Sequence, residues 1–211
     1  MSAATPAGNA VSGLGHLAVA AAAPGGQGSA PLIRVRRYSA RMEVTIRRAR
    51  SVDVRAIRRL IDIYAADRLL LSKATVALFE DVQEFWVAEA ADGLIVGCGA
   101  VHVMWEDLAE VRTVAVDPAF RGRKVGHQVV SALIDAARDI GVRRVFVLTF
   151  ETDFFASFGF VPIDGTPVQP DVFEQLLRSY DEGVAEFLDL ERVKPNTLGN
   201  TRMLLHVGTV S

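Results

Sequence analysis

The sequence predicts an α/β domain built on a mixed sheet with helices on both faces. Strand-like and helix-like stretches follow one another in the order β-α-α-β-β-β-α-β-α-β, without internal repeats. Half of the 211 residues are hydrophobic, and a chain of this length can bury about 70% of its unfolded surface. A single packed domain is therefore expected after the N-terminal region.

The first half of this domain is predicted to contain three strands and two helices. The first helix is indicated by apolar residues at helical spacing, and an Asp92-Gly93 turn joins the last two strands as a hairpin. Ser51 or Asp53 is expected to cap the first helix. The predicted elements are strands over 44–48, 84–90 and 94–105, a helix with Ile57, Leu60, Ile61 and Tyr64 on its apolar face, and a helix over 75–81.

The second half is predicted to continue with a central strand, because residues 109–116 are mostly apolar. A helix follows, ended by Gly141, and a later short helix is closed by Gly159. The apolar face of the longer helix carries Val129, Val130, Leu133, Ile134 and Ala137. The remaining predicted elements are strands over 143–150 and 201–207 and a helix over 171–180.

Residues 1–41 are predicted to be a disordered extension, and residues 42–211 the folded domain. The extension is rich in Ala, Gly, Ser and Pro, and its apolar stretch HLAVAAAAP is too short to span a bilayer. The stretch lacks a positively charged region before it, so a signal peptide is not predicted. The alternative interpretation is an over-long gene model, in which Met42 would be the natural start.

Charge and cysteine usage exclude several classes of protein. The first 42 residues contain four arginines and no acidic residue, so the remainder carries 19 basic against 25 acidic residues. An acidic body argues against nucleic acid as a partner. The lone Cys98 lies in an apolar run and is expected to be a buried, inert thiol in a cytoplasmic protein. Four scattered histidines provide no metal-ligand spacing, so no metal is expected.

Residues 114–130, VAVDPAFRGRKVGHQVV, join a strand to a helix through a short basic turn that contains glycine. The first N–H groups of a helix lack internal partners, and the helix dipole makes this end positive. A strand, a turn with little side chain and a helix start therefore indicate a phosphate-binding site.

This motif, the element order and FFASFGF (154–160) together resemble the GCN5-related N-acetyltransferases over about residues 43–207. The resemblance implies a mostly antiparallel sheet that is splayed in the middle, and transfer of acetyl from acetyl-CoA to an amine. Arg121, Gly122 and Gly126 match the family's pyrophosphate loop, whereas Lys124 stands where the family has a glycine. Backbone N–H groups hold the phosphate, so the lysine is compatible with binding if its side chain points outward.

A closer resemblance is to the short actinobacterial amino-acid acetyltransferases that act as N-acetylglutamate synthases in arginine biosynthesis. The matching strings are EFWVAE, GCGAVHVMW, EVRTVAVDP, RVFVLTFET, SYDEGVAEFLDL and KPNTLGNTRMLL. The implied acceptor is L-glutamate or glutamine.

The resemblance also implies residue roles. The N–H of Val114 is expected to face the thioester carbonyl, and Val116 to bind the pantetheine amide. Phe155 stands where relatives often carry a tyrosine acid, so no side-chain acid is expected. The residues expected to bind acetyl-CoA are Val114, Ala115, Val116, Arg121, Gly122, Arg123, Lys124, Val125, Gly126, Phe154, Phe155 and Ser157.

Glu110 and Arg112 lie two residues apart on one strand and therefore share a face. Glu110 is expected to accept the amine's proton, directly or through water, and Arg112 to bind a substrate carboxylate bidentately. The alternative is a structural ion pair or an exposed strand end. Further expected substrate contacts are Thr113, Lys194, Asn196 and Arg202, the last three in or beside a loop marked by Pro195 and Gly199.

The predicted function is therefore acetyl-CoA-dependent N-acetylation of a small amino acid, with acetyl-CoA and L-glutamate as partners and no membrane or nucleic acid. Two alternatives remain open. The acceptor can be another amine, such as glutamine, another amino acid or a protein N-terminus, or the chain can be a CoA- or amino-acid-sensing module without turnover. Assembly into a homodimer is also left open.

Overall fold

A computed structural model of the chain describes residues 43–65, 70, 73–193 and 199–208. The predicted extension over 1–41 lies outside these residues and stays a prediction. Within the described part, the strands form one sheet in the order β1-β2-β3-β4-β5-β7-β6, and all neighbours are antiparallel except β4 and β5. The strands are β1 Val44–Arg48, β2 Phe85–Ala90, β3 Ile95–Trp105, β4 Leu108–Val116, β5 Arg144–Thr149, β6 Val161–Pro162 and β7 Thr201–His206. The mixed, mostly antiparallel sheet confirms the prediction.

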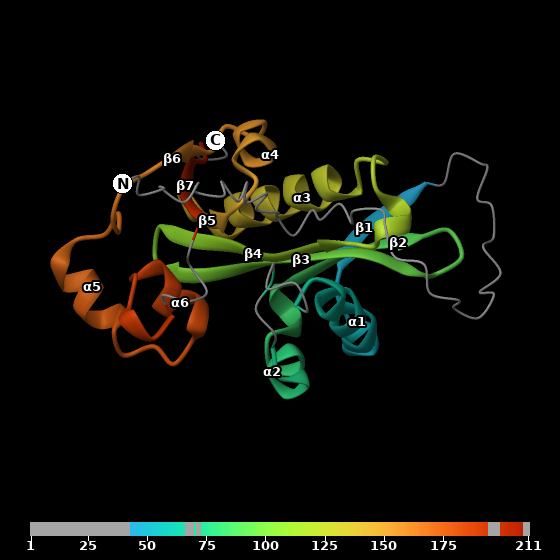
Figure 1. Ribbon diagram of the computed structural model, residues 1–211, viewed down its shortest axis with the longest axis horizontal. Coiled ribbons are helices and arrows are strands. Elements are labelled where there is room, and N and C mark those ends of the chain that lie inside the picture. The colour runs from blue at the N-terminus through green and yellow to red at the C-terminus, as the bar shows by residue number, and fades with distance from the viewer. Residues whose placement is uncertain (1–42, 66–69, 71–72, 194–198, 209–211) are drawn as a thin grey trace, which may run out of the picture.

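Helices cover both faces of the sheet, as predicted (Figure 1). α3 and α4 lie on one face, α1 and α2 on the other, and α5 and α6 on that second face at the opposite end of the sheet (Figure 1). The helices are α1 Val54–Ala65, α2 Thr75–Glu80, α3 Val125–Ile140, α4 Thr152–Ala156, α5 Pro170–Leu176 and α6 Glu182–Phe187. None of the helices in the described part is both long and apolar enough to cross a membrane.

Alternation along the strands divides the core between the two faces. On β5, Val145 and Val147 pack in the cluster beneath α3, whereas Phe146 packs in the cluster with α5 and α6. The predicted apolar face of α3 is buried, and each of its larger side chains contributes roughly 1.5–3 kcal/mol. The two layers thereby hold the middle of the sheet between helices.

α3 approaches β3 closely because two glycines of the sequence GCG leave room for it. A Cβ on Gly97 would lie 2.9 Å from a Val125 methyl carbon, and one on Gly99 would lie 2.8 Å from Leu133. Cys98, between them, points to the opposite face and is fully buried, as predicted, and burial raises the pKa of its thiol to about 12. The small residues therefore set the position of the start of α3.

Several boundaries differ from the sequence prediction. The helix predicted over 171–180 ends at Leu176, and neither α6 nor the two-residue strand β6 was predicted. Six residues are too few for a clear helical period. At the first helix, Arg50 is the N-cap of a 3₁₀ turn over Ser51–Asp53 that precedes α1, and Asp53 accepts from the Arg50 N–H. Ser51 is therefore not the cap, and the Asp53 carboxylate accepts the Arg50 N–H from inside the turn.

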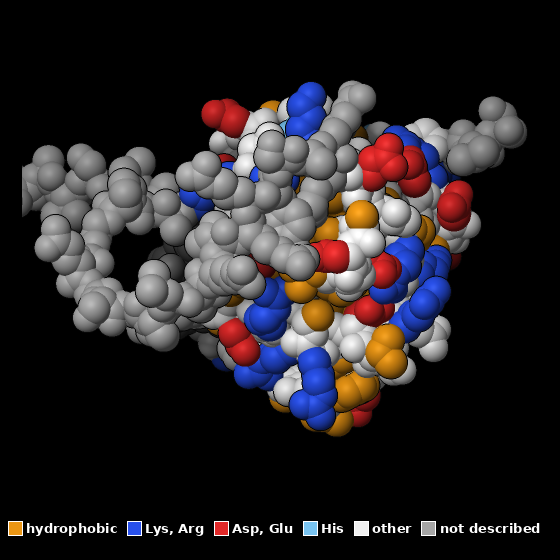
Figure 2. Space-filling view, turned by 90° about the vertical axis from the view of Figure 1, so that its right-hand side faces the viewer, with side chains coloured by type: hydrophobic (Ala, Val, Ile, Leu, Met, Phe, Trp, Pro, Cys, Tyr) orange, Lys and Arg blue, Asp and Glu red, His pale blue; other side chains and the backbone are white. Residues whose placement is uncertain are grey.

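Surface charges are mixed. Figure 2 shows basic and acidic side chains interspersed with apolar ones over the described residues of this face. A group of partly buried ion pairs surrounds the middle of β4.

Candidate active site

The sheet opens between β4 and β5. The two strands pair only through Leu108–Glu110 and Arg144–Phe146, although β4 continues to Val116 and β5 to Thr149. A bulge accompanies the opening, because Cys98 pairs with Ala115 whereas Ala100 pairs with Arg112, which leaves one extra residue on β4. Thr113 lies in this bulge with a left-handed φ of 57°. The predicted splay is thus present, and Glu110 lies at the point where it begins.

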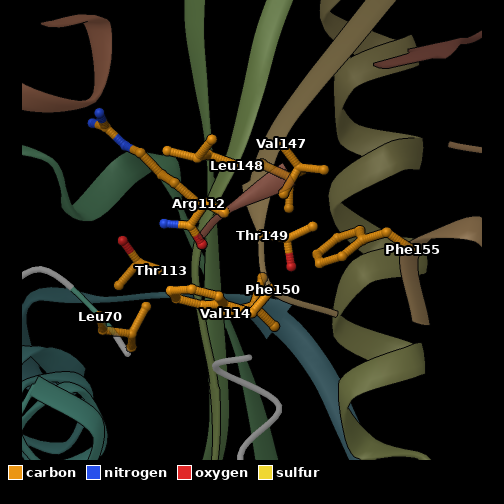
Figure 3. A pocket seen from close by; sticks show the side chains of 11 residues that line it. Leu70, Arg112, Thr113, Val114, Val147, Leu148, Thr149, Phe150 and Phe155 are labelled. Carbon is orange, nitrogen blue, oxygen red and sulfur yellow. The ribbon is translucent and has the colours of Figure 1, made fainter. Parts of the chain in front are cut away.

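A cavity of about 60 Å³ occupies the opening between the strands. Figure 3 shows its lining, with Thr113 and Val114 from β4, Val147 and Thr149 from β5, and the Phe155 ring from α4. Thr149 is buried, and its hydroxyl accepts from the Glu151 N–H at 3.0 Å. The cavity has both apolar and polar lining and can hold a small organic group between the strands.

A second cavity, of about 240 Å³, lies farther along β4 beneath the loop that starts α3. Within this loop Gly122 has a φ of 73° and Lys124 a φ of 60°, both in the left-handed region. Lys124 occupies a conformation that glycine would adopt without cost. Lys124 is exposed, and its place beside a bound phosphate stays a prediction.

The start of α3 presents free backbone donors to this cavity. The internal hydrogen bonds of the helix begin with the Gln128 N–H, which donates to the Lys124 carbonyl at 3.1 Å. The N–H groups of residues 125–127 precede that bond and therefore need other acceptors. Arg121 and Lys124 line the same cavity and add positive charge. Donors and charge together suit a phosphate.

α1 supports the end of β4 before the loop. The Tyr64 hydroxyl donates to the Val116 carbonyl, and Arg59 donates to the Asp117 carboxylate at 3.2 Å. Burial raises the pKa of Tyr64 to about 12, so its hydroxyl remains a donor at physiological pH. Asp117 in turn accepts from the Ala119 N–H at 3.0 Å, which fixes the turn. One buried and one exposed contact from α1 thus support the loop.

Nine of the twelve residues predicted to bind the cofactor line one of the two cavities. Val114 and Phe155 line the cavity in the splay, and Val116, Arg121, Gly122, Lys124, Val125, Gly126 and Phe154 line the one beneath the loop. Ala115 packs instead in the core beneath α1, Arg123 lies over the Phe120 ring, and Ser157 is exposed, with its hydroxyl donating to the Phe154 carbonyl. The cofactor roles of all twelve residues stay predictions.

Arg112 lies within a group of four carboxylates. Its Nη1 is 2.8 Å from Asp181 Oδ1 and 4.0 Å from Glu110 Oε2, and its Nη2 is 2.9 Å from Glu84 Oε2 and 3.6 Å from Asp81 Oδ2. Burial lowers the pKa of Arg112, but the surrounding carboxylates outweigh it and raise the pKa overall. Figure 3 shows the guanidinium pointing away from Phe155. The geometry therefore contains the ion pair that was the alternative for Glu110 and Arg112, together with partners from distant segments, and the substrate role of Arg112 stays a prediction.

Glu110 is 3% exposed, and burial raises the pKa of its carboxyl group, with the positive charge of Arg112 opposing the shift. Its Oε2 has no hydrogen-bond partner among the described residues. Glu186 on α6 is also buried, and its pKa is raised to about 8 by burial and by Glu110. A carboxyl group in this environment binds a proton more readily than it does in water.

Glu84 connects Arg112 to β3. Its Oε1 is 2.7 Å from His102 Nδ1, and its Oε2 accepts from Arg112. Burial would raise the pKa of Glu84, but the hydrogen bond with His102 and the charge of Arg112 lower it overall. Glu84 therefore remains ionised and holds the arginine from one side, while Asp181 holds it from the other.

The other predicted substrate contacts are placed differently. Thr113 and Arg112 line the cavity in the splay, and so does Asn200 of the predicted loop. Lys194 and Asn196 lie outside the described residues. The Arg202 guanidinium donates to the Gly165, Glu186 and Phe187 carbonyls and stacks on the Phe146 ring. The structure gives Arg202 a role in holding β7 to α6, and its substrate role stays a prediction.

Sequence reasoning missed several residues of the site. Glu84 and Asp181 gave no signal because they lie 28 and 69 positions from the arginine that they contact. The sequence analysis assigned no site role to His127, yet His127 lines the cavity beneath the loop and packs edge-on against Phe154. Its place one residue after Gly126, in the first turn of a helix, was the available signal.

Comparison with known proteins agrees with this geometry. The model of the acetyltransferase (GNAT) family matches residues 55–160. The chain is 61% identical over 162 residues to the amino-acid acetyltransferase of Mycobacterium tuberculosis, an alignment that covers 76% of this chain and 92% of that protein.

Two solved structures are also similar. One is the crystal structure of Rv2747 from Mycobacterium tuberculosis in complex with CoA and NLQ, with a TM-score of 0.76, 60% identity, and coverage of 78% of this chain and 99% of that one. The other is N-acetylglutamate synthase from Neisseria gonorrhoeae complexed with coenzyme A and N-acetyl-glutamate, with a TM-score of 0.62 and 24% identity over 79% of this chain and 35% of that one. The second similarity concerns the fold alone.

Proposed function

The chain belongs to the acetyltransferase (GNAT) family, and from this premise we propose that it transfers acetyl from acetyl-CoA to the α-amine of an amino acid, with L-glutamate as the acceptor. The observation that carries the proposal is the succession of two cavities along β4, one in the splay and one beneath the α3 loop. The similar Mycobacterium tuberculosis protein is named an amino-acid acetyltransferase, which supports the acceptor class.

The residues present fit acetyl-CoA. The backbone of residues 122–126 and the side chains of Arg121 and Lys124 would hold the pyrophosphate at the start of α3. Val114 on β4 and Phe155 on α4 would line the path of the acyl end into the splay. When bound, the co-substrate supplies an activated acetyl thioester.

Glu110 is the proposed base. A free amino acid enters as an ammonium, which must lose a proton before its nitrogen can attack a carbonyl carbon. Burial raises the pKa of Glu110 toward the range in which a carboxylate can accept that proton. Val111 and Arg112 line the cavity, whereas the buried Glu110 precedes them on β4 and is not among the lining residues. The proposed proton path from the amine to Glu110 therefore includes a water molecule.

Arg112 is the proposed contact for the acceptor's carboxylate. It lines the cavity, and its buried Nε has no hydrogen-bond partner among the residues described. A carboxylate approaching from the splay would meet this N–H donor and the arginine's charge. The Val114 N–H is the proposed donor to the thioester carbonyl, and no side-chain acid is assigned to the departing thiolate because Phe155 offers none.

The test is a measurement of CoA release with L-glutamate, L-glutamine, other amino acids and a peptide N-terminus. The proposal expects the largest kcat/KM with L-glutamate. A preference for another amine would replace the acceptor, and binding of acetyl-CoA without release of CoA toward any amine would favour the sensing module.

A variant pair tests the base. Glu110→Gln is expected to lower kcat by about 10²-fold with acetyl-CoA affinity retained, whereas Glu174→Gln, at an exposed site on α5, is the matched control. Full activity of Glu110→Gln would remove the assignment of Glu110 as the base.

The proposed setting is the cytoplasm and the first step of arginine biosynthesis. The proposal applies equally to a monomer and a homodimer.

A further inference from the structure

Gly183 lies in the first turn of α6, where glycine has no conformational reason to occur. It is not among the described glycines with positive φ, and its neighbours are helical. Glycine is a weak helix former, and alanine would favour the same backbone. The reason for glycine must therefore be space around its Cα.

The space is occupied by the charged group of the candidate active site. A Cβ on Gly183 would lie 2.8 Å from Glu110 Oε2, 3.0 Å from Arg112 Nη1 and 3.0 Å from Asp181 Oδ1. All three nearest atoms are the polar ends of side chains. The bare Cα thus forms one wall of the pocket that holds the Glu110 carboxyl group.

That wall matters because hydrogen bonds do not position the same oxygen. Glu110 Oε2 has no hydrogen-bond partner in the described part of the chain, and the closest Arg112 nitrogen is 4.0 Å away. The side chain is 3% exposed, so solvent hardly contributes to fixing its position. The oxygen therefore lies in the space that a side chain on residue 183 would take.

We propose that Gly183 is a positioning residue: its missing side chain keeps the Glu110 carboxyl group beside Arg112 at the entrance of the splay. The proposal rests on the proposed function for the role of Glu110 as base. Gly183 itself would touch neither acceptor nor acetyl-CoA. Its effect would reach the reaction through the place of the carboxyl group.

The first test compares Gly183→Ala with Gly208→Ala, a glycine that also lacks positive φ and whose added Cβ would meet nothing within 4 Å. Gly183→Ala is expected to lower kcat by up to about 10²-fold, the effect of misplacing a reacting group by about 1 Å. The KM for acetyl-CoA should be unchanged, and the midpoint of the kcat–pH profile should shift. Equal kcat and equal pH midpoints in the two variants would overturn the proposal.

A double-mutant cycle tests the contact itself. Glu110→Asp shortens the side chain by one methylene and vacates the place that the new Cβ would take. In the Gly183→Ala background, Glu110→Asp should therefore lower the urea midpoint less than it does in the wild-type chain. Additive changes would contradict the contact. If Gly183→Ala alone does not fold, recovery of folding in the double variant supports the proposal and its absence overturns it.

The cycle separates this inference from the proposed function. Urea unfolding needs no substrate, so the contact is decided even if no amine is acetylated. Conversely, the Gly183→Ala and Glu110→Asp changes can be non-additive in the urea cycle while Glu110→Gln keeps full activity. That result would leave Gly183 in contact with Glu110 but would end its role in positioning a base.

Discussion

Arg112 of β4 donates to Asp181, the N-cap residue of α6, across 2.8 Å, although 69 positions separate the two residues in the chain. The same Asp181 oxygen accepts from the Val184 N–H and thereby starts the helix. One carboxylate thus joins the middle of the splayed strand to a C-terminal helix. The position of α6 and the charge at the candidate active site are therefore linked.

Arg112→Lys is expected to raise the KM for glutamate by about tenfold, the cost of one hydrogen bond to a charged group, while sparing the KM for acetyl-CoA. Lysine keeps the charge but replaces a planar fork by a single nitrogen, which cannot serve Glu84, Asp181 and a substrate carboxylate together. Arg138→Lys, at the exposed ion pair with Asp135, is the control. If both KM values rise together, or if the protein unfolds, Arg112 is structural.

Gly126→Glu is expected to weaken CoA binding by at least about 2 kcal/mol in calorimetry, because it places bulk and negative charge at the start of α3. Gln128→Glu introduces the same charge at an exposed position of the same turn and controls for charge alone. A folded Gly126→Glu variant with wild-type affinity would show that the pyrophosphate lies elsewhere.

Phe155→Leu is expected to lower kcat less than Glu110→Gln does, because the phenylalanine ring supplies packing and no proton. Phe160→Leu is the matched control, because the two rings are both 2% exposed and lie 5.4 Å apart.

We further expect kcat to rise with pH to a plateau, without a fall near the ordinary tyrosine pKa of about 10. A fall that disappears when Tyr180 or Ser157 is replaced would identify a side-chain acid.

Glu186 is expected to make the folded state less stable as pH rises from about 5 to 8. Its pKa is about 8 in the fold and 4.5 as a reference, so the folded protein retains a proton that the unfolded chain has released. Each such proton lowers the free energy of unfolding by about 1.4 kcal/mol per pH unit. Besides burial, the groups that set the shift are Glu110, Glu182 and Asp181, which raise the pKa, and Lys73, which lowers it.

Urea unfolding at pH values across this range measures the free energy of unfolding. Glu186→Gln should make this free energy fall less steeply with pH. Some slope should remain, because Glu110 has a pKa raised in the same direction. Glu174→Gln, an exposed carboxylate on α5, should leave the slope unchanged. An identical pH dependence in the wild-type and Glu186→Gln proteins would show that Glu186 is ionised in the fold.

The strands and helices with strong periodicity could be predicted from the sequence because periodicity reports local burial. The apolar face of α3 and the hairpin of β2 and β3 agree with the prediction within a few residues. The short α6 could not be predicted, since six residues show too little period, yet it carries Asp181 and Gly183 to the site.

The sequence by itself determined the strand-turn-helix of the α3 loop, since the signals for a strand end, a turn and a helix start all lie within about ten neighbouring residues. It also placed Glu110 and Arg112 on one face of one strand. Only the tertiary structure decided what surrounds them. Glu84 and Asp181 reach Arg112 from 28 and 69 positions away, and the space left by Gly183 has meaning only where α6 packs on β4. Such contacts depend on how elements pack, which no local pattern of residues encodes.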